Sequence, residues 1–355
     1  ALAALLVCLA LLAAACGGGN GDDGDADSGS VAVSSDPVIL PADTRPIIED
    51  LQAKIDEANA SLDVALQDSI EASPARDIDD AFFKGFKAKG QTSAGSTRRR
   101  LADAQVYVPR QTDYPARFFA FVKLANADDP AAPQISRLRV YEKSAADEPW
   151  KLALYVTVPR DFVLPEIRVD ADGFAETVAD ENGDELKVDP SRLPAEFADY
   201  LSRFAEGASS DLFAPGRFTS EASEAFRASV DKDAQATITT TVEVTPGRYP
   251  VQAFRTADGG AVVLFTENVN YSYAPAPGKV LNPISGSEGL LEPGEYSSLQ
   301  RNVVNMVAAV VPPADAEGLV QIVGTTGGTV SFDGEPAAPP SPSGSPTPPP
   351  PTASP

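Results

Sequence analysis

The sequence predicts an α+β protein built from two similar halves, each placing helices before an antiparallel sheet. Two observations support this. Residues 44–335 form a stretch longer than one hydrophobic core usually holds, so two domains are expected. Within it, a three- to four-residue apolar period changes to short β-branched and aromatic runs, and this order occurs twice.

The first helix is expected to begin after Asp43-Thr44, residues that cap helices, with Pro46 tolerated in the first turn. Ser73-Pro74 should end it. A second helix is expected near Asp77, with Ile78, Phe82 and Phe86 on one stripe. Apolar residues of the first helix recur at helical spacing: Ile48, Leu51, Ile55, Ala58, Leu62 and Leu66.

From Gln105 the period changes to that of strands. The runs QVYVP, RFFAFVKLA, SRLRVYEK and WKLALYVTVP are rich in aromatic and β-branched residues and are separated by turn-like segments. Strands so close together, without intervening helices, predict an antiparallel meander rather than βαβ units.

The second half repeats this order. We expect Ser191 to cap a helix with four apolar residues inward, a second helix over 220–230, and the strand ATITTTVEV. The runs PVQAFRT and AVVLFTENVNYSY, joined at Asp258-Gly259, predict a hairpin. Residues 296–311 are expected to be helical, and LVQIVG and TVSF to form a strand pair around Gly327-Gly328. The inward residues of the two helices are Leu193, Phe197, Leu201, Phe204, Phe226 and Val230.

Helices followed by a curved antiparallel sheet is the order of the NTF2-like and cystatin-like folds. With strings such as EPWKLALYVTVP and YPVQAFRTADGGAVV, the chain resembles a group of actinobacterial lipoproteins of unknown function that carry two such units. The resemblance implies NTF2-like domains at 44–165 and 191–335, joined by an acidic linker at 166–190. It carries no catalytic residue over.

The N-terminal residues predict an exported, anchored protein. Residues 1–15, ALAALLVCLALLAAA, have the length of a signal-peptide apolar core and are short of the about twenty residues that span a bilayer. Ala13 to Ala15 followed by Cys16 resembles a bacterial lipobox, with Ala where Leu is preferred three residues before the cysteine. That resemblance implies cleavage before Cys16, lipidation with acyl chains such as palmitate, and attachment to the outer face of the cell membrane. The alternative is an ordinary secretory signal with Cys16 incidental.

The segments flanking the folded part are expected to lack packed structure. Residues 16–43 are rich in Gly, Ser and Asp and predict a flexible tether. Residues 336–355 are Pro-rich and uncharged, which predicts an extended tail. This tail is either a spacer through the cell wall, a ligand for a Pro-binding module, or an unselected linker end.

Composition excludes several function classes. The chain has 28 basic and 51 acidic residues, a net charge of -23 and no histidine. Nucleic-acid binding is therefore not expected, and no catalytic site that needs histidine can be built. Carboxylate, Tyr, Lys or Ser chemistry and oxygen-ligand metals stay open. We predict no catalytic residue, metal or cofactor.

Three groups of residues are candidate sites. The triplet Arg98-Arg99-Arg100 suits an anionic partner, although such triplets usually sit on exposed loops or helix ends balanced by carboxylates. The stretch DADGFAETVADENGDE offers oxygen ligands but lacks the spacing of a Ca²⁺ loop. Polar groups for a ligand pocket between helix and sheet are strand tyrosines, which more often belong to the rim of a core: Tyr107, Tyr155, Tyr271 and Tyr273.

The function expected from these residues is that of a non-enzymatic binding or scaffold lipoprotein, with an envelope protein or cell-wall component as partner. Two alternatives stay open. One is a small-ligand-binding lipoprotein that feeds a transporter. The other is an enzyme that uses carboxylate or tyrosine chemistry in one NTF2-like cone.

Overall fold

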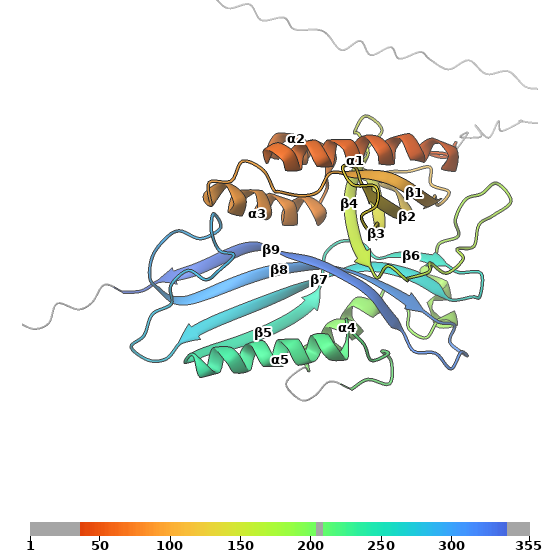
Figure 1. The fold of residues 1–355 in the computed structure, drawn as a ribbon. Helices are drawn as coiled ribbons and strands as arrows, with labels where there is room; N and C mark the ends of the chain where they lie inside the picture. The colour runs from red at the N-terminus through yellow and green to blue at the C-terminus, as the bar shows by residue number, and fades with distance from the viewer. Residues whose placement is uncertain (1–35, 204–208, 339–355) are drawn as a thin grey trace, which may run out of the picture. The chain divides into compact units, whose positions relative to one another are not determined.

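A computed structural model describes residues 36–203 and 209–338, with the side chains of residues 180–182 left aside. From Pro37 onward the described chain belongs to one compact unit. Its described residues form five α-helices and two antiparallel sheets (Figure 1). The predicted α+β class is therefore confirmed.

The first half supplies three helices and a four-stranded meander, sheet 1, in the order β1-β2-β3-β4. This is the predicted meander, although its first strand begins six residues before Gln105. A short 3-10 helix, η1 (Pro41–Asp43), comes first, followed by α1 (Thr44–Ser61), α2 (Val64–Ile70), α3 (Ala75–Ala88), β1 (Arg99–Tyr107), β2 (Ala116–Asn126), β3 (Ile135–Lys143) and β4 (Lys151–Val158).

The second half supplies two helices and sheet 2, in the order β5-β7-β8-β9 with β6 paired to β7. The hairpin predicted at Asp258-Gly259 is the β6–β7 connection, which confirms it. The elements are η2 (Asp180–Glu185), α4 (Leu193–Ser202), α5 (Ser220–Gln235), β5 (Ile238–Pro246), β6 (Gln252–Arg255), β7 (Ala261–Pro275), β8 (Tyr296–Val311) and β9 (Gln321–Pro336).

Both sheets are covered by apolar side chains on their two faces. On β2, Phe118 packs towards α1–α3, whereas Phe119 packs towards sheet 2 against Phe254 of β6, with ring centroids 5.0 Å apart. The opposite face of sheet 2 packs against α4 through Phe197 and Phe265. Burial on both faces explains why these strands read as nearly continuous apolar runs rather than alternating ones.

The predicted first helix is in fact two helices. Leu62 adopts a left-handed conformation, with φ at 53°, and ends α1. Asp63 then caps α2, because its side chain accepts a 3.0 Å hydrogen bond from the backbone nitrogen of Leu66. The apolar period runs through this break without interruption, so it predicted one helix where the cap at Asp63 makes two.

The buried stripe of α3 also differs from the prediction. Ile78 and Phe83 are buried, but Phe82 is 46% exposed. Phe83 packs into the core between the helices and sheet 1. Phe82 points towards β9, and its ring centroid lies 6.4 Å from that of Phe86.

The predicted helix over 296–311 is wrong: this segment is β8, a strand between β7 and β9. Val303 and Val307 pack towards α4, while Val304 and Met306 pack towards sheet 1. Because both faces are buried, the strand shows apolar residues three and four apart, as a helix does. Its many valines favour a strand.

The predicted turn at Gly327-Gly328 is also wrong, because both glycines lie inside the single long strand β9. A Cβ atom on Gly328 would come 2.5 Å from Cγ2 of Ile78, and one on Gly327 would come 2.0 Å from Oδ1 of Asn305. The glycines therefore allow α3 and the neighbouring strand to approach β9 closely.

The helix expected after Ser191 is α4, but it begins at Leu193 and Ser191 does not cap it. The N-cap residue is Arg192, which makes no side-chain capping bond, and the backbone nitrogen of Ser191 donates instead to Asp189 at 2.7 Å. Leu193, Phe197 and Leu201 are buried, as predicted. Phe204 lies outside the described residues.

Candidate functional site

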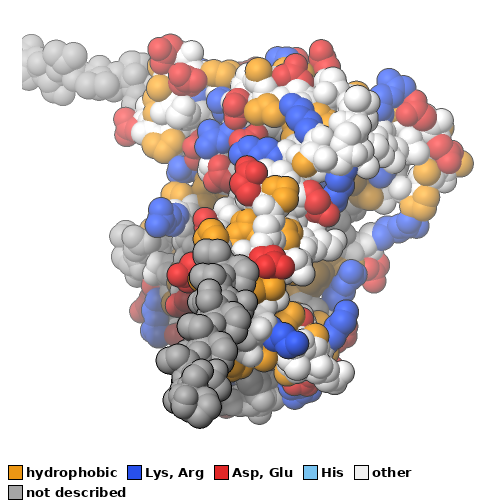
Figure 2. Space-filling model, turned by 90° about the vertical axis from the view of Figure 1, so that its left-hand side faces the viewer, with side chains coloured by type: hydrophobic (Ala, Val, Ile, Leu, Met, Phe, Trp, Pro, Cys, Tyr) orange, Lys and Arg blue, Asp and Glu red, His pale blue; other side chains and the backbone are white. Residues whose placement is uncertain are grey.

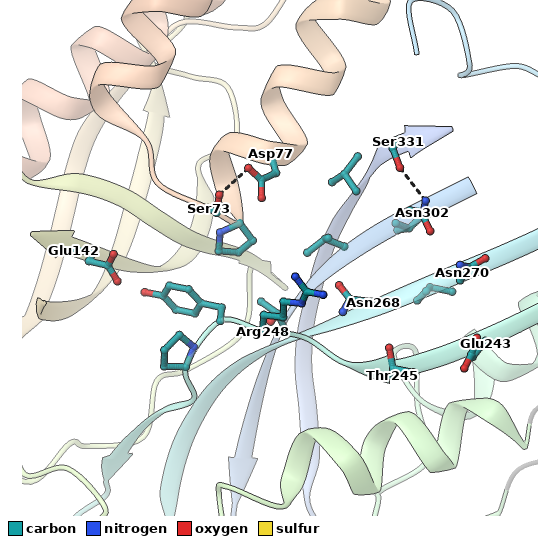
Figure 3. A pocket seen from close by; sticks show the side chains of 18 of the residues that line it. Ser73, Asp77, Glu142, Glu243, Thr245, Arg248, Asn268, Asn270, Asn302 and Ser331 are labelled. Carbon is teal, nitrogen blue, oxygen red and sulfur yellow. Dashed lines mark hydrogen bonds between the residues drawn. The ribbon is translucent and has the colours of Figure 1, made fainter. Parts of the chain in front are cut away.

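A cleft of about 890 Å³ lies between the start of α3, the ends of β2 and β3 in sheet 1, and the face of sheet 2 turned towards them. Figure 3 shows side chains from all three elements projecting into it. Its floor is formed by β5, β7, β8 and β9, so four strands distant in sequence contribute to one surface.

The floor of the cleft is a row of polar side chains that crosses sheet 2. Glu243 of β5 is paired with Asn270 of β7, Asn270 with Asn302 of β8, and Asn302 with Ser331 of β9. A second row pairs Thr245 with Asn268. Side chains two residues apart on a strand share a face, which brings both rows into the cleft.

One wall of the cleft holds a partly buried ion pair. Nε of Arg117 lies 2.7 Å from Oε2 of Glu142, with side-chain exposures of only 18% and 17%. The Arg117 guanidinium also lies 5.6 Å from the ring centre of Tyr249. Burial and the Glu142 carboxylate raise the pKa of Tyr249, whose buried hydroxyl lies beside the pair but makes no hydrogen bond of good geometry.

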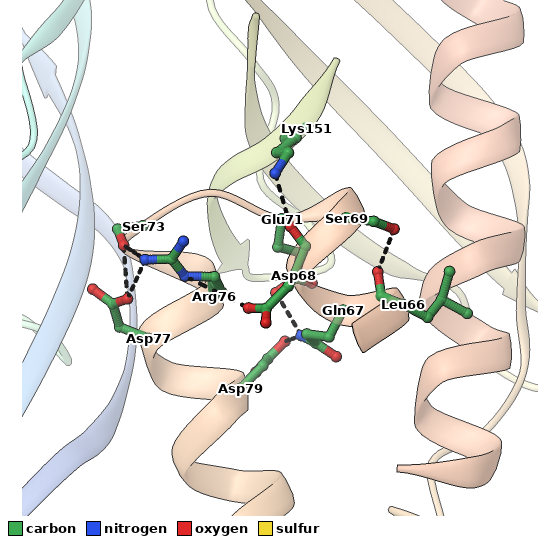
Figure 4. Close-up of polar contacts among 10 residues, drawn as sticks. All are labelled: Leu66, Gln67, Asp68, Ser69, Glu71, Ser73, Arg76, Asp77, Asp79 and Lys151. Carbon is green, nitrogen blue, oxygen red and sulfur yellow. Dashed lines mark hydrogen bonds and ion pairs between the residues drawn. The ribbon is translucent and has the colours of Figure 1, made fainter. Parts of the chain in front are cut away.

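The opposite wall is the start of α3. Asp77 accepts a 2.7 Å hydrogen bond from the Ser73 hydroxyl and a 3.3 Å contact from Arg76 (Figure 4). The Asp77 carboxylate is therefore neutralised locally. Arg117 and Glu142 likewise neutralise each other. The two other charged residues that line the cleft, Glu243 and Arg248, have opposite charges and form no ion pair in the described chain.

A second polar cluster lies behind this wall, between α2, α3 and sheet 1. Nε2 of Gln67 donates to Glu71 at 2.6 Å and lies 3.3 Å from Oδ2 of Asp79 (Figure 4). Burial raises the pKa of Asp79 to about 6 and that of Glu71 well above its usual range, and the neighbouring Asp79 raises the pKa of Glu71 further.

Tyr155, one of the predicted site residues, belongs to this buried cluster. Its hydroxyl donates to Asp79 at 3.3 Å, and the Arg137 guanidinium lies 4.8 Å from its ring centre. Burial raises the pKa of Tyr155 and lowers that of Arg137 to about 10. Helices α2 and α3 cover this part of β4, so Tyr155 does not line the cleft.

The arginine triplet runs from the exposed coil before sheet 1 into its first strand. Arg99 and Arg100 are the first residues of β1, and Arg98 pairs with Asp128. The triplet lines a smaller groove of about 490 Å³ together with acidic residues of α1, among them Asp56, which accepts a 2.7 Å hydrogen bond from the Arg99 backbone nitrogen.

The remaining predicted residues lie outside the cleft. Tyr271 lies on the α5 side of sheet 2, 6.3 Å from the ring of Tyr273, and Arg301 lies over its face at 5.3 Å. Burial raises the pKa of Tyr271 to about 12. Tyr107 stacks on Phe119 at 5.7 Å. None of these tyrosines lines the cleft.

Arginine side chains form ion pairs with several carboxylates of the acidic stretch DADGFAETVADENGDE. Arg110 binds Asp170 at 3.0 Å and Asp172 at 2.6 Å, and the buried Arg255 binds Glu185 at 2.9 Å. Among the described residues, no group of carboxylates is arranged to hold a metal ion.

The surface shows no gathering of one charge on the face in Figure 2, where acidic and basic side chains are interspersed. The described residues also contain no helix long and apolar enough to cross a membrane. Cys16 lies outside the described residues.

Sequence reasoning missed the cleft residues. The signal was present in TENVNYSY, where Asn268, Asn270 and Ser272 alternate with Val269 and Tyr271. Alternation places the amides on one face of β7, but the matching residues on β8 were hidden because that segment was taken for a helix.

These features define a two-sheet α+β protein with a polar cleft at the junction of its halves. Residues 35–334 match the family described as a domain of unknown function, DUF8094, and the chain belongs to that family.

Relatives of the chain occur in Streptomyces. It is 28% identical to an uncharacterized lipoprotein of Streptomyces coelicolor over 87% of this chain and 91% of that protein. It is 26% identical to a second uncharacterized lipoprotein of that species, over 86% of each chain. A third, from Streptomyces avermitilis, is 28% identical over 67% of this chain and 69% of its own length. No solved structure matches the chain.

Proposed function

We propose that this protein is an extracytoplasmic lipoprotein that binds a component of the cell envelope in the cleft between α3, sheet 1 and sheet 2. It acts without catalysis, as a binding or scaffold protein, and it holds no cofactor and no nucleic acid. Each half is a helix-on-sheet unit of the NTF2-like or cystatin-like kind, as the order of helices before antiparallel strands supports.

The lipid anchor is supported by two observations. The relatives in Streptomyces are lipoproteins, and in this chain an uncharged apolar run of residues 1–15 is followed directly by Cys16. An acyl chain contributes about 0.8 kcal/mol of membrane affinity for each buried CH₂, and two or three chains together hold a protein stably on the bilayer.

The binding role rests on one observation, the composition of the cleft. A floor of Asn, Ser and Thr side chains on four strands of sheet 2 is a surface that offers hydrogen bonds at positions set by the sheet. Ligand sites combine such placed polar groups with apolar walls. Here Tyr249, Pro250 and Pro74 supply the apolar part.

The absence of catalysis is supported by where the titrating groups lie. Glu71 and Asp79, whose pKa values are raised, belong to the cluster with Tyr155 and do not line the cleft, and Glu71 is 1% exposed. The other carboxyls with raised pKa values do not line the cleft either: Asp56, Asp80 and the fully buried Glu267. A substrate would need access to such a group. We therefore favour a structural role for the cluster over the alternative of a carboxylate and tyrosine enzyme.

The test is retention of envelope material by the immobilised full-length protein. Detergent-solubilised, enzymatically fragmented Streptomyces envelope is passed over the wild type, Asn270→Trp and Asn282→Trp, and bound lipids, glycans and proteins are identified by mass spectrometry. Asn270→Trp fills the cleft, whereas Asn282 is exposed and lies outside its lining.

We expect a component that the wild type and Asn282→Trp retain and Asn270→Trp does not. Circular dichroism verifies that both variants are folded, and Thr245→Trp provides a second cleft-filling variant. Equal retention by all four proteins contradicts the proposal.

A further inference from the structure

The hydrogen-bonding groups on the cleft floor alternate between donors and acceptors. In the described chain, Nδ2 of Asn302 is engaged by Ser331 at 2.8 Å and Asp333 at 3.2 Å, and Nδ2 of Asn268 by the Pro246 carbonyl at 3.3 Å. Their Oδ1 atoms make no hydrogen bond in the described chain and remain available as acceptors. Asn270 is the reverse, because its Oδ1 accepts from Ser272 at 3.4 Å and its Nδ2 is unused.

The spacing of these groups is set by the sheet. Asn270 and Asn302 are direct cross-strand partners, so their backbones lie about 4.8 Å apart, and Asn268 and Asn270 are separated by about 6.8 Å along β7. Asn268, Asn270 and Asn302 thus form a grid in which the free donor of Asn270 lies between the free acceptors of the other two. The backbone hydrogen bonds between β7 and β8 fix their spacing.

The floor also contains a hydroxyl whose bonding capacity the protein leaves unused. Oγ1 of Thr266 is buried and has no hydrogen-bond partner among the described residues, and Thr266 is only 2% exposed. Gly247 packs directly on this oxygen, so the hydroxyl is not among the groups that a ligand in the cleft can reach.

The charges around the grid do not select an ion. Arg117 and Glu142 neutralise each other, Asp77 is held by Ser73 and Arg76, and the remaining Glu243 and Arg248 are of opposite sign. A strongly anionic ligand would in addition be repelled by a chain of net charge -23. The cleft chemistry therefore matches a neutral ligand.

Whether the ligand is a polypeptide or a polyhydroxylated molecule depends on whether the cleft exposes a strand edge or a sheet face. An extended peptide adds to a free strand edge through main-chain hydrogen bonds. The cleft instead presents the face of sheet 2, where the backbone groups of β7 and β8 are already paired to their neighbours. Side-chain amides and hydroxyls do the recognition here, and each sugar hydroxyl both donates and accepts.

We infer that the cleft is a carbohydrate site that takes a neutral oligosaccharide, with the Asn268–Asn270–Asn302 grid binding ring hydroxyls and Tyr249, Pro250 and Pro74 contacting the apolar faces of the sugar rings. This inference rests on the proposed function, because it names the ligand class of the same cleft.

The test reads the asparagine side chains directly. Full-length protein labelled with ¹⁵N in mild detergent is titrated with chitohexaose, mannohexaose and maltohexaose, and the side-chain NH₂ resonances are followed. Hexagalacturonate and a neutral Gly-Ser hexapeptide are the comparison ligands. Asn126 and Asn282, which do not line the cleft, serve as internal controls.

We expect at least one neutral hexasaccharide to shift the resonances of Asn268, Asn270 and Asn302 saturably while those of Asn126 and Asn282 stay in place. Asn270→Ala should weaken that binding at least tenfold, and Asn282→Ala should leave it unchanged.

Two outcomes overturn the inference. Either no neutral saccharide moves the cleft resonances, or the hexapeptide or hexagalacturonate binds there in preference. If Asn270→Trp still abolishes envelope retention in either case, the proposed binding function stands and only the ligand class is wrong. If retention is also unaffected, both fail.

Discussion

The amide nitrogen of Gln67 on α2 donates to Glu71 at 2.6 Å while lying 3.3 Å from the Asp79 carboxylate on α3. Two carboxyl groups from different helices thus share one donor in a buried place. Burial disfavours their charged forms, and two neighbouring negative charges would repel each other. The cluster joins α2 to α3 most strongly when it retains a proton.

This arrangement predicts that stability depends on pH through Asp79. Its pKa is raised from 3.8 to about 6, mainly by burial. Between these values the folded protein holds a proton that the unfolded chain has lost, so the free energy of unfolding falls as pH rises through that window. Asp79→Asn should reduce the fall by about 1–3 kcal/mol, measured by urea unfolding from pH 4 to pH 7.

The exposed Ser69→Ala on α2 is the control, because it leaves the carboxyls intact. It should shift the stability curve without changing its pH dependence. Parallel curves for the wild type and Asp79→Asn would show that Asp79 does not carry the effect.

The contact between β9 and α3 gives a second prediction. A Cβ atom on Gly328 would lie 2.5 Å from Cγ2 of the buried Ile78, closer than carbon atoms pack. Gly328→Ala should therefore destabilise the protein by about 1–3 kcal/mol, as overpacking does. Gly216→Ala, where a Cβ atom meets nothing within 4 Å, is the matched control and should be close to neutral. Equal melting temperatures for the two variants would contradict the close approach.

The same glycines show where sequence reasoning succeeds and fails. The presence of helices and the meander of the first half were predictable, although not the break at Leu62, because an apolar period and β-branched runs reflect local structure. Gly327-Gly328 and the valines of β8 were misread, because their composition is set by partners distant in sequence. A glycine required by a helix packed on top of a strand looks, in the sequence alone, like a glycine required by a turn.

The candidate site was less predictable than the fold. Arg98, Tyr155 and Tyr271 attracted attention as charged or aromatic residues, yet they lie in three separate places. The cleft is made of asparagines that are unremarkable one by one and become a surface only through the register of β7 with β8. Register between strands is not encoded in either strand alone.

The ion pair in the cleft wall predicts a contrast with an exposed one. Arg117 and Glu142 are less than one-fifth exposed, so Glu142→Gln leaves a poorly solvated guanidinium without its counter-charge. We expect a loss of about 1–3 kcal/mol, between the values for surface and fully buried pairs. Asp128→Asn, which breaks the exposed pair with Arg98, should leave the melting temperature nearly unchanged. The melting temperatures of both variants, measured by thermal unfolding, test this contrast. A smaller decrease for Glu142→Gln than for Asp128→Asn would refute the argument.

The proposed lipid anchor makes the last prediction, for which the chain supplies its own control. Cys16 follows the apolar run directly, whereas Cys8 lies within it and would be removed with the signal segment. Cys16→Ser should abolish the acyl mass and release the protein from the membrane fraction, because the thiol is the group that carries the lipid. Cys8→Ser should leave both properties unchanged. Fractionation of expressing cells, with intact-mass spectrometry of the purified proteins, measures both. If Cys16→Ser stays in the membrane fraction and its measured mass differs from that of the wild type only by the substitution, the protein is held there by something other than a lipid on Cys16.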